Sequence, residues 1–430
     1  MNSQSEITAS GEIVVGIDWA DQEHALYTVY PDRRRATQGI LEQTPEAIDA
    51  WMAGLQEQFP EVPVIVAIER SNGALVAALL KFPQVIIYPV NPTQLHNYRK
   101  SQKQSGAKND PSDARLLCQY LRNYREQMRP LKPDDVGTRE LALLAEQRRG
   151  AVDQRTAFVL ELKEVLKQYF PVVLQLVHTD LCVHFILQLI LKWPTLAQLQ
   201  KVHPQKVRSF FYAHNLRGDL VEHRLTIIAD ARPLTEDPAL VNAGRLRAQK
   251  CARLILALNQ TIREYDARLK ELLESHADYE IVKSLPGSAL QMQSRIIAAL
   301  GTDRERYQNS VEVQCVSGIA PVTIQSGRSK TVHHRFACSK FLKQTFHEYA
   351  SLSITKSRWA RAYYSMQRDH GKSAQTAKRA LAFKWIRIIF RCWKDRVPYD
   401  EERYIASITR SNSPLLAYLE QDVVQSSTVV

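Results

Sequence analysis

The sequence predicts an α/β domain with a mixed sheet, followed by a helical arm and a mostly helical C-terminal domain. Three observations support this fold class. Runs of apolar, β-branched residues alternate with helix-like segments from residue 12 to about 130, which is typical of a sheet flanked by helices. Apolar residues then recur with heptad spacing over residues 251–272, as in a coiled coil. Beyond residue 281, basic and aromatic residues are interleaved in helix-like segments.

The α/β segment, residues 12–130, follows an N-terminal tail, residues 1–11, which we expect to be disordered. Its expected elements are, in order, strands at 13–18 and 25–30, a helix at 45–58, a strand at 64–69, a helix near 73–81, a strand at 85–90 and a helix after residue 110. Strands that come first and then alternate with helices favour a mixed sheet with flanking helices.

Residues 131–280 are expected to form a helical, coiled-coil region with an insertion. One helix carries the heptad seam, whose residues are Cys251, Ile255, Leu258, Ile262, Tyr265, Leu269 and Leu272. A helix at about 138–169 is a suitable antiparallel partner. Residues 171–245 contain several prolines and short helical pieces, to which we assign no role. A C-terminal domain at 281–410 and a polar tail at 411–430 complete the chain.

The composition favours a polyanionic partner. The chain of 430 residues carries a net charge of +12 and has a pI near 9.3. Residues 328–396 contain 17 Lys and Arg against three acidic residues, so this segment alone carries +14. Its aromatic residues, particularly those from Trp385 to Trp393, fit the core faces of amphipathic helices. Its cations are expected to contact nucleic acid.

Cysteine usage and hydropathy indicate the compartment. The six cysteines are scattered and form no C-x-x-C pair, which argues against a structural zinc site and a disulfide framework. The N-terminus is polar and lacks a signal peptide, and the longest apolar stretch, near residues 183–191, is too short to span a bilayer. We therefore expect a cytoplasmic protein with no membrane partner.

Four carboxylates suggest a metal-dependent phosphoryl-transfer site. Asp18 and Glu69 each close a predicted strand. Asp110 and Asp113 lie three residues apart, on one face of the following helix. Together the four would form an oxygen-rich cluster whose negative charge requires Mg²⁺ or Mn²⁺. Structural alternatives exist, because Asp110 fits a helix N-cap followed by a proline and the strand-end acids could be turn residues or ion-pair partners.

An ATPase is a further alternative, since sugar-kinase-like folds also begin with strand-Gly-Ile-Asp. Such folds usually continue with a Gly/Thr phosphate loop, whereas Trp19-Ala20-Asp21 follows here. We therefore favour nucleic-acid chemistry.

The order of these acids and several neighbouring motifs resemble known enzymes. The motifs are VVGIDWA, VAIERS, YPVNP, KNDPSDAR, SLPG and GIAPVTIQSG. Residues 12–130 resemble the RNase-H-like domain of the RuvC Holliday-junction resolvase. More closely, residues 12–130 and 280–400 resemble the DEDD transposases of the IS110 insertion-sequence family, which includes the Piv-type DNA invertases. This resemblance implies an RNase-H-like (RuvC-like) catalytic domain, a C-terminal transposase domain and DNA transposase or recombinase activity.

The resemblance also implies a serine nucleophile in the C-terminal domain. In the family this serine belongs to a Ser-Gly pair that follows a Gly-x-x-Pro loop. The loop here is residues 318–321, so the implied nucleophile is Ser326. Ser-Gly is also a common turn dipeptide, and Ser317 and Ser329 are nearby alternatives. Neighbouring cations could hold the scissile phosphate: Arg328, Lys330 and Arg335.

The same resemblance implies different roles for the acids and the serine. The four acids would hold one or two Mg²⁺ ions, while Ser326 would attack the phosphate and form a phosphoserine with DNA. Holliday-junction intermediates, active sites shared within a homodimer or homotetramer, donor and target DNA, and a structured bridge RNA are also implied. No helix-turn-helix or zinc-finger reader is apparent in the sequence. The remaining expected nucleic-acid contacts are Lys108, Arg115, Lys340 and Lys343.

One motif departs from the family, and two other functions stay open. After the Pro286-Gly287 turn the family usually has a second glycine, where this chain has Ala289. Because alanine disfavours positive φ, we do not expect a backbone contact with DNA there. The first alternative function is a hydrolytic RuvC-like junction-resolving endonuclease, in which water attacks. The second is a non-catalytic nucleic-acid-binding protein.

Overall fold

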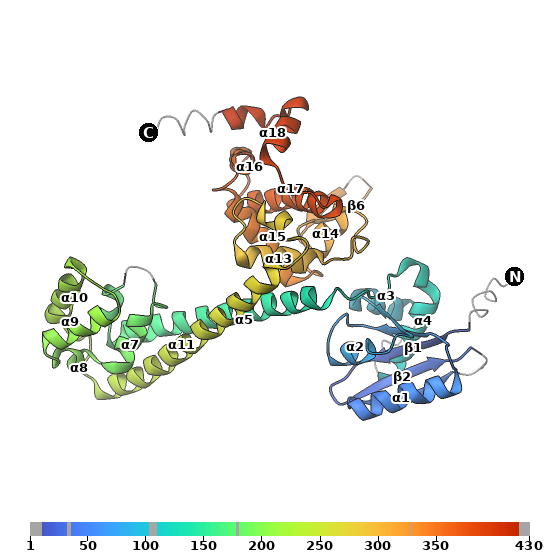
Figure 1. Ribbon diagram of the computed structural model, residues 1–430, viewed down its shortest axis with the longest axis horizontal. Helices are drawn as coiled ribbons and strands as arrows, with labels where there is room; N and C mark the ends of the chain where they lie inside the picture. The colour runs from blue at the N-terminus through green and yellow to red at the C-terminus, as the bar shows by residue number, and fades with distance from the viewer. Residues whose placement is uncertain (1–10, 32–35, 103–109, 178–179, 328, 421–430) are drawn as a thin grey trace. The chain divides into compact units, whose positions relative to one another are not determined.

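The computed structural model describes residues 11–31, 36–102, 110–177, 180–327 and 329–420 (Figure 1). The chain divides into two compact units, Met1–Pro133 and Asp134–Val430.

The first unit contains a five-stranded mixed sheet. Its strands are β1 (Ile13–Asp18), β2 (Glu23–Val29), β3 (Thr37–Glu42), β4 (Val64–Ile68) and β5 (Val85–Pro89). They lie in the order β3-β2-β1-β4-β5, with β1, β4 and β5 parallel and the β1–β2 and β2–β3 pairs antiparallel. The mixed sheet was predicted, and it is consistent with an RNase-H-like domain. The strand β3 was missed, because this edge strand buries one side chain in six and has no apolar run.

Helices cover both faces of this sheet. The elements are α1 (Pro45–Gln58), α2 (Ala74–Leu79), α3 (Pro92–Gln102), α4 (Asp110–Tyr124) and a short 3-10 turn, Arg125–Gln127. The side chains of Ile13, Val15 and Ile17 share a core with α1 and α2. The alternate side chains of the neighbouring strand, Ile65 and Ala67, share a core with α3 and α4. Successive residues along a strand therefore point toward opposite helical layers of the domain, as the pleat of a strand requires.

Gly16 allows the closest approach between α4 and the sheet. A Cβ atom at this position would lie 2.0 Å from the carbonyl oxygen of Ala114 and 2.5 Å from the amide nitrogen of Cys118. Both obstacles are backbone atoms, so a side-chain rotation cannot relieve the clash. The glycine is thus required by packing, since no side chain fits between β1 and α4.

Gly16→Ala is expected to lower the free energy of unfolding by about 3 kcal/mol, because α4 must move away from β1. Urea denaturation of the full chain, followed by circular dichroism, would measure the change. Gly39→Ala is the matched control in the same sheet, since nothing lies within 4 Å of the added Cβ. Equal stability of the two variants would contradict this account of the packing.

The second unit begins with two long helices joined through a helical cap. They are α5 (Val136–Tyr169) and α11 (Pro238–Glu274). The pair is antiparallel, because Glu140 meets Arg268 at one end and Glu161 meets Arg247 toward the other (Figure 1). Four residues of the predicted heptad seam are buried, namely Cys251, Ile255, Ile262 and Leu269. Coiled-coil winding of the pair remains a prediction.

The segment without an assigned role folds at the far end of this pair. Its helices are α6 (Val172–Gln175), α7 (His184–Lys192), α8 (Leu196–Gln200), α9 (Pro204–Ala213) and α10 (Asp219–Asp230). They share a core with α5 and α11 that includes Phe170, Ile186 and Phe211.

The C-terminal part of the second unit contains a two-stranded hairpin among helices. The elements are α12 (Tyr279–Lys283), α13 (Leu290–Leu300), α14 (Ser310–Val316), β6 (Val322–Ser326), β7 (Ser329–His333), α15 (Lys340–Ser353), α16 (Arg358–Asp369), α17 (Ala374–Asp395) and α18 (Glu401–Arg410). Trp359, Trp385 and Trp393 are at most 2% exposed, which confirms that these aromatic residues form a core. None of the helices in the described ranges is long and apolar enough to cross a membrane.

Glu348 of α15 joins the long pair to the C-terminal helices. Its carboxylate accepts hydrogen bonds from Arg149 of α5 and from Arg295 of α13. Arg295 also donates to the hydroxyl of Thr345, at 3.0 Å. This bridge lies near the base of α5 and α11, where both helices enter the core of the C-terminal part.

A histidine at the end of α11 is held in its neutral form by its hydrogen bonds. The amide of Asp278 donates to Nδ1 of His276 at 3.0 Å, so Nδ1 carries no proton. Nε2 therefore holds the proton and donates to the hydroxyl of Thr138, 2.9 Å away. That hydroxyl donates in turn to Asp135, at 2.6 Å. Burial lowers the pKa of His276.

This lowered pKa predicts a loss of stability in mild acid. Below pH of about 6.5 the unfolded chain binds a proton at His276 that the folded chain does not bind, so the free energy of unfolding should fall by up to about 1 kcal/mol per pH unit. Denaturation between pH 7.5 and 5.5 would measure the slope. His276→Gln should flatten it, and His370→Gln, at an exposed position, should not. Identical slopes in all three proteins would refute the prediction.

Candidate active site

Two of the predicted acids lie side by side at the carboxyl ends of parallel strands. Ile17 of β1 pairs with Ile68 of β4, so the next residues, Asp18 and Glu69, are neighbours in register. Because Ile17 faces α1 and α2, Asp18 faces the layer of α3 and α4. Both acids are partly exposed.

The first turn of α4 lies at the same edge of the sheet. Ala114 lies against Gly16, and the thiol of Cys118, one turn later, lies 3.6 Å from the carbonyl oxygen of Val14. The helix α4 therefore runs antiparallel to β1, and its N-terminal turn lies beside the end of β1. We call this region, formed by Asp18, Glu69 and the first turn of α4, the acidic edge.

The helix α4 carries the other two predicted acids, Asp110 and Asp113. Asp113 is buried, and its Oδ1 atom forms an ion pair with Nη2 of Arg99, 2.7 Å away. Asp110 is the first residue of α4, and its side chain lies outside the described part of the chain.

Two residues that the sequence analysis missed contact each other beside the acidic edge. The guanidinium of Arg70, which follows Glu69, lies 3.7 Å from the ring centroid of Trp19, which follows Asp18. This cation–π contact joins the ends of β1 and β4. The only available signal was that both residues come directly after a candidate acid.

A buried histidine orders the turn after Asp18. The ring of His24 is fully buried, and its Nδ1 atom accepts a hydrogen bond from the amide of Ala20 at 3.2 Å. Nε2 then carries the proton and donates to Gln43 at 2.6 Å. No spacing in the sequence distinguished this residue.

Ser326 is the last residue of β6, at the tip of the hairpin. It pairs with Ser329, the first residue of β7, and Gly327 in the intervening turn has φ +58°. Both serines are exposed. The other alternative, Ser317, is fully buried and donates to the carbonyl oxygen of Gln314 at 3.2 Å. A DNA phosphate can therefore approach Ser326 or Ser329, but not Ser317.

Comparisons with known proteins match both parts of this arrangement. Residues 15–171 match a family model of DEDD transposases of the IS110 type. Residues 279–365 match the model of the transposase IS116/IS110/IS902 family. The chain belongs to the IS110 family of transposases. Membership makes it an enzyme that acts on DNA, as the motifs predicted.

Individual relatives cover between 76% and 93% of the transposase. The IS117 mini-circle protein of Streptomyces coelicolor is 26% identical over 411 residues, covering 93% of this chain and 98% of the relative. The 42 kDa protein of insertion element IS900 from Mycobacterium paratuberculosis is 24% identical, with 89% and 96% covered. The 44.8 kDa protein of IS116 from Streptomyces clavuligerus is 23% identical, with 76% and 81% covered.

The predicted nucleic-acid contacts of the transposase differ in their surroundings. Arg335 is half-buried at the base of the hairpin, where it donates to the carbonyl oxygen of Ala320 and to the thiol of Cys315. The exposed cations are Arg115, Lys330 and Lys340, and Lys343 is half-buried. Lys108 and Arg328 lie outside the described residues.

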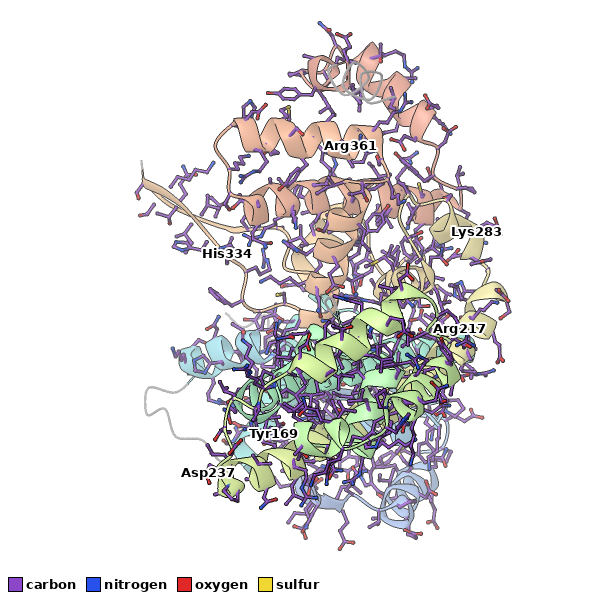
Figure 2. The ribbon with its side chains drawn as sticks, turned by 90° about the vertical axis from the view of Figure 1, so that its left-hand side faces the viewer. Tyr169, Arg217, Asp237, Lys283, His334 and Arg361 are labelled. Atoms are coloured by element: carbon purple, nitrogen blue, oxygen red, sulfur yellow. The ribbon has the colours of Figure 1, made fainter. Side chains whose placement is uncertain are left out.

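Further basic groups lie in the C-terminal third of the chain. His334, labelled in Figure 2, follows β7 and accepts a hydrogen bond from Arg379 of α17. Arg361, on α16, belongs to the same basic third of the chain (Figure 2).

The turn that departs from the family pattern has an ordinary backbone at the altered position. Gly287 has φ +77°, whereas Ala289 has φ −92° and precedes the first residue of α13. Alanine is therefore unstrained at this place.

The donor set of the acidic edge fits a hard divalent cation. Carboxylate oxygens are the ligands that Mg²⁺ and Mn²⁺ prefer, and the acidic edge gathers them from two strands and one helix. Within the ranges that the structure describes, no three His, Cys, Asp or Glu side chains lie close enough to enclose an ion. Since Asp113 is bound to Arg99, its participation requires a change in that ion pair.

A cavity of the first unit lies elsewhere. Its volume is about 640 Å³, and its lining includes Glu12, Val14, Tyr88 and Arg125, at the amino ends of β1 and β4. It does not include the acidic edge.

Proposed function

We propose that this transposase cleaves and exchanges DNA strands through a phosphoserine at Ser326, with a divalent metal held at the acidic edge. The observation that carries the proposal is the convergence of Asp18, Glu69 and the first turn of α4 at one edge of an RNase-H-like sheet. The alternative of isolated turn residues does not account for this convergence.

Each group has a defined task in this proposal. The four acids, Asp18, Glu69, Asp110 and Asp113, would hold the metal. Mg²⁺ or Mn²⁺, when bound, supplies positive charge that polarises the scissile phosphate. The hydroxyl of Ser326 loses its proton and forms a bond to phosphorus, while the bond to the 3′-oxygen breaks and that oxygen takes up a proton. The new 3′-hydroxyl can attack a second phosphoserine, which exchanges strands without loss of bond energy.

The two halves of this site come from different units of the chain. The acids belong to the proposed catalytic domain, residues 12–130, and the serine to the proposed transposase domain, residues 281–410. The family resemblance supports sharing between subunits of a homodimer or homotetramer. The long helices of residues 131–280 are the proposed assembly element. Nucleoid DNA in the cytoplasm is the proposed place of action.

A bridge RNA is the proposed source of target recognition. The segment 328–396 carries +14 yet contains no recognisable base-reading motif, so it suits phosphate contacts with RNA as well as with DNA. If sequencing of RNA that co-purifies with the transposase, expressed with its flanking DNA, finds only heterogeneous species, direct DNA recognition becomes the better model.

The hydrolytic alternative is tested with wild-type protein. Labelled DNA carrying the element ends is incubated with Mg²⁺ and resolved on a denaturing gel before and after protease digestion. A protease-sensitive covalent adduct is expected. Cleavage without an adduct would favour a junction-resolving nuclease, in which water attacks. Absence of any strand cleavage would favour a non-catalytic nucleic-acid-binding protein.

A further inference from the structure

The ion pair between Arg99 and Asp113 lies largely out of contact with solvent. It joins α3 to α4, and the two side chains are 16% and 4% exposed. Nε of Arg99 is buried and has no hydrogen-bond partner among the described residues. Burying a charged pair is costly, and an unsatisfied donor adds to the cost.

The negative charge of the acidic edge suggests that the Arg99–Asp113 ion pair also affects metal binding. Asp18 and Glu69 add negative charge at the same edge, and Arg70 stacks on Trp19. Within the described ranges, Arg99 is a cation in direct contact with a carboxylate of α4. A guanidinium and a divalent metal are both cations, so they compete for one carboxylate and repel each other at short range.

We propose that Arg99 is an internal counter-ion that holds Asp113 in the metal-free enzyme and competes with the divalent metal for that carboxylate. The inference rests on the proposed metal site at the acidic edge. Arg99 is a positioning residue here, because it acts through Asp113. Its presence stabilises the metal-free fold and weakens metal binding.

The experiment measures metal binding and stability rather than activity. Mn²⁺ is titrated calorimetrically into the full chain without DNA, for wild type and Arg99→Gln. The variant should bind Mn²⁺ about tenfold more tightly, because a repelling charge has been removed. Its unfolding temperature without metal should fall by roughly 5 °C, because Asp113 is left buried and unpaired.

Two further variants test whether the positive charge at position 99 causes the change in Mn²⁺ affinity. Arg99→Lys keeps the positive charge, so its Mn²⁺ affinity should stay within about threefold of wild type. Lys100→Gln removes one charge from the same helix at an exposed position, where salt screens it, and should leave both quantities unchanged. If Arg99→Gln unfolds without metal, both proteins are titrated in a stabilising osmolyte in which the variant is folded, and their dissociation constants are compared as before. Tighter Mn²⁺ binding by the variant supports the inference, and equal or weaker binding overturns it.

The outcomes separate this inference from the proposed function. Weaker or unchanged Mn²⁺ binding by Arg99→Gln, with wild-type binding intact, would overturn the counter-ion role and leave the metal site standing. If wild type binds no Mn²⁺, or if Asp18→Asn leaves Mn²⁺ binding unaltered, the metal site and the counter-ion role both fail.

Discussion

Ser326→Ala is expected to abolish the covalent protein–DNA adduct and to reduce strand exchange by about three orders of magnitude or more. The reason is chemical, because alanine has no oxygen that can form a bond to phosphorus. The substitution lies at an exposed hairpin tip, so it should leave the unfolding temperature within about 1 °C of wild type. A denaturing gel with labelled DNA measures the adduct, and thermal unfolding confirms the fold.

Ser329→Ala is the matched control for this prediction. Ser329 pairs with Ser326 across the same turn and is equally exposed, so the two variants differ in the position of the lost hydroxyl and in little else. We expect Ser329→Ala to retain the adduct. Loss of the adduct in Ser329→Ala and its retention in Ser326→Ala would move the nucleophile to Ser329. Adducts in both single variants would exclude each serine as the sole nucleophile.

Asp18→Asn is expected to reduce strand cleavage by about 10³-fold while preserving the fold. Asparagine keeps the size of the side chain but removes the negative charge, so a hard divalent cation loses a ligand at the acidic edge. Cleavage of DNA that carries the element ends, measured over a range of Mg²⁺ concentrations, gives the effect. Glu69→Gln should behave in the same way, because its carboxylate is adjacent in register.

Asp21→Asn is the control that distinguishes loss of a metal ligand from the loss of one negative charge near the site. Asp21 lies three residues beyond Asp18, in the exposed turn before β2, and is not part of the acidic edge. We expect cleavage by this variant to stay within about twofold of wild type. Undiminished cleavage by both Asp18→Asn and Glu69→Gln, with the fold intact, would remove the acidic edge from the reaction.

The parts of the fold that were predictable have strong local patterns. Strands β1, β4 and β5 are apolar runs, because both of their faces are covered by helices. The edge strand β3 has no such pattern, since its partner β2 specifies it through backbone hydrogen bonds. The helices between residues 171 and 238 share a core whose members come from distant parts of the chain. Long-range packing of this kind leaves no periodic signal in a short segment.

The candidate site was predictable in part for the same reason. Asp18 and Glu69 each follow an apolar run that is recognisable as a strand from the sequence. When two such strands are parallel neighbours in a sheet, their carboxyl ends lie together. The ion pair of Arg99 with Asp113 depends on how α3 packs against α4, which no spacing of residues specifies. The Ser-Gly pair at Ser326 was compatible with a turn, but the two strands of the hairpin left no signal, because nearly all of their side chains are exposed.

The length of α5 has a mechanical consequence. Its 34 residues span about 50 Å, so the helices α6 to α10 are held at the end of a lever. A tilt of about 10° at the base would displace that end by roughly 9 Å. The carboxylate of Glu348, with Arg149 and Arg295, lies close to the fulcrum. A partner that binds and tilts the distal helices would therefore apply a small torque at this bridge. Because Glu348 and Arg295 belong to α15 and α13, that torque would strain these two helices of the C-terminal part.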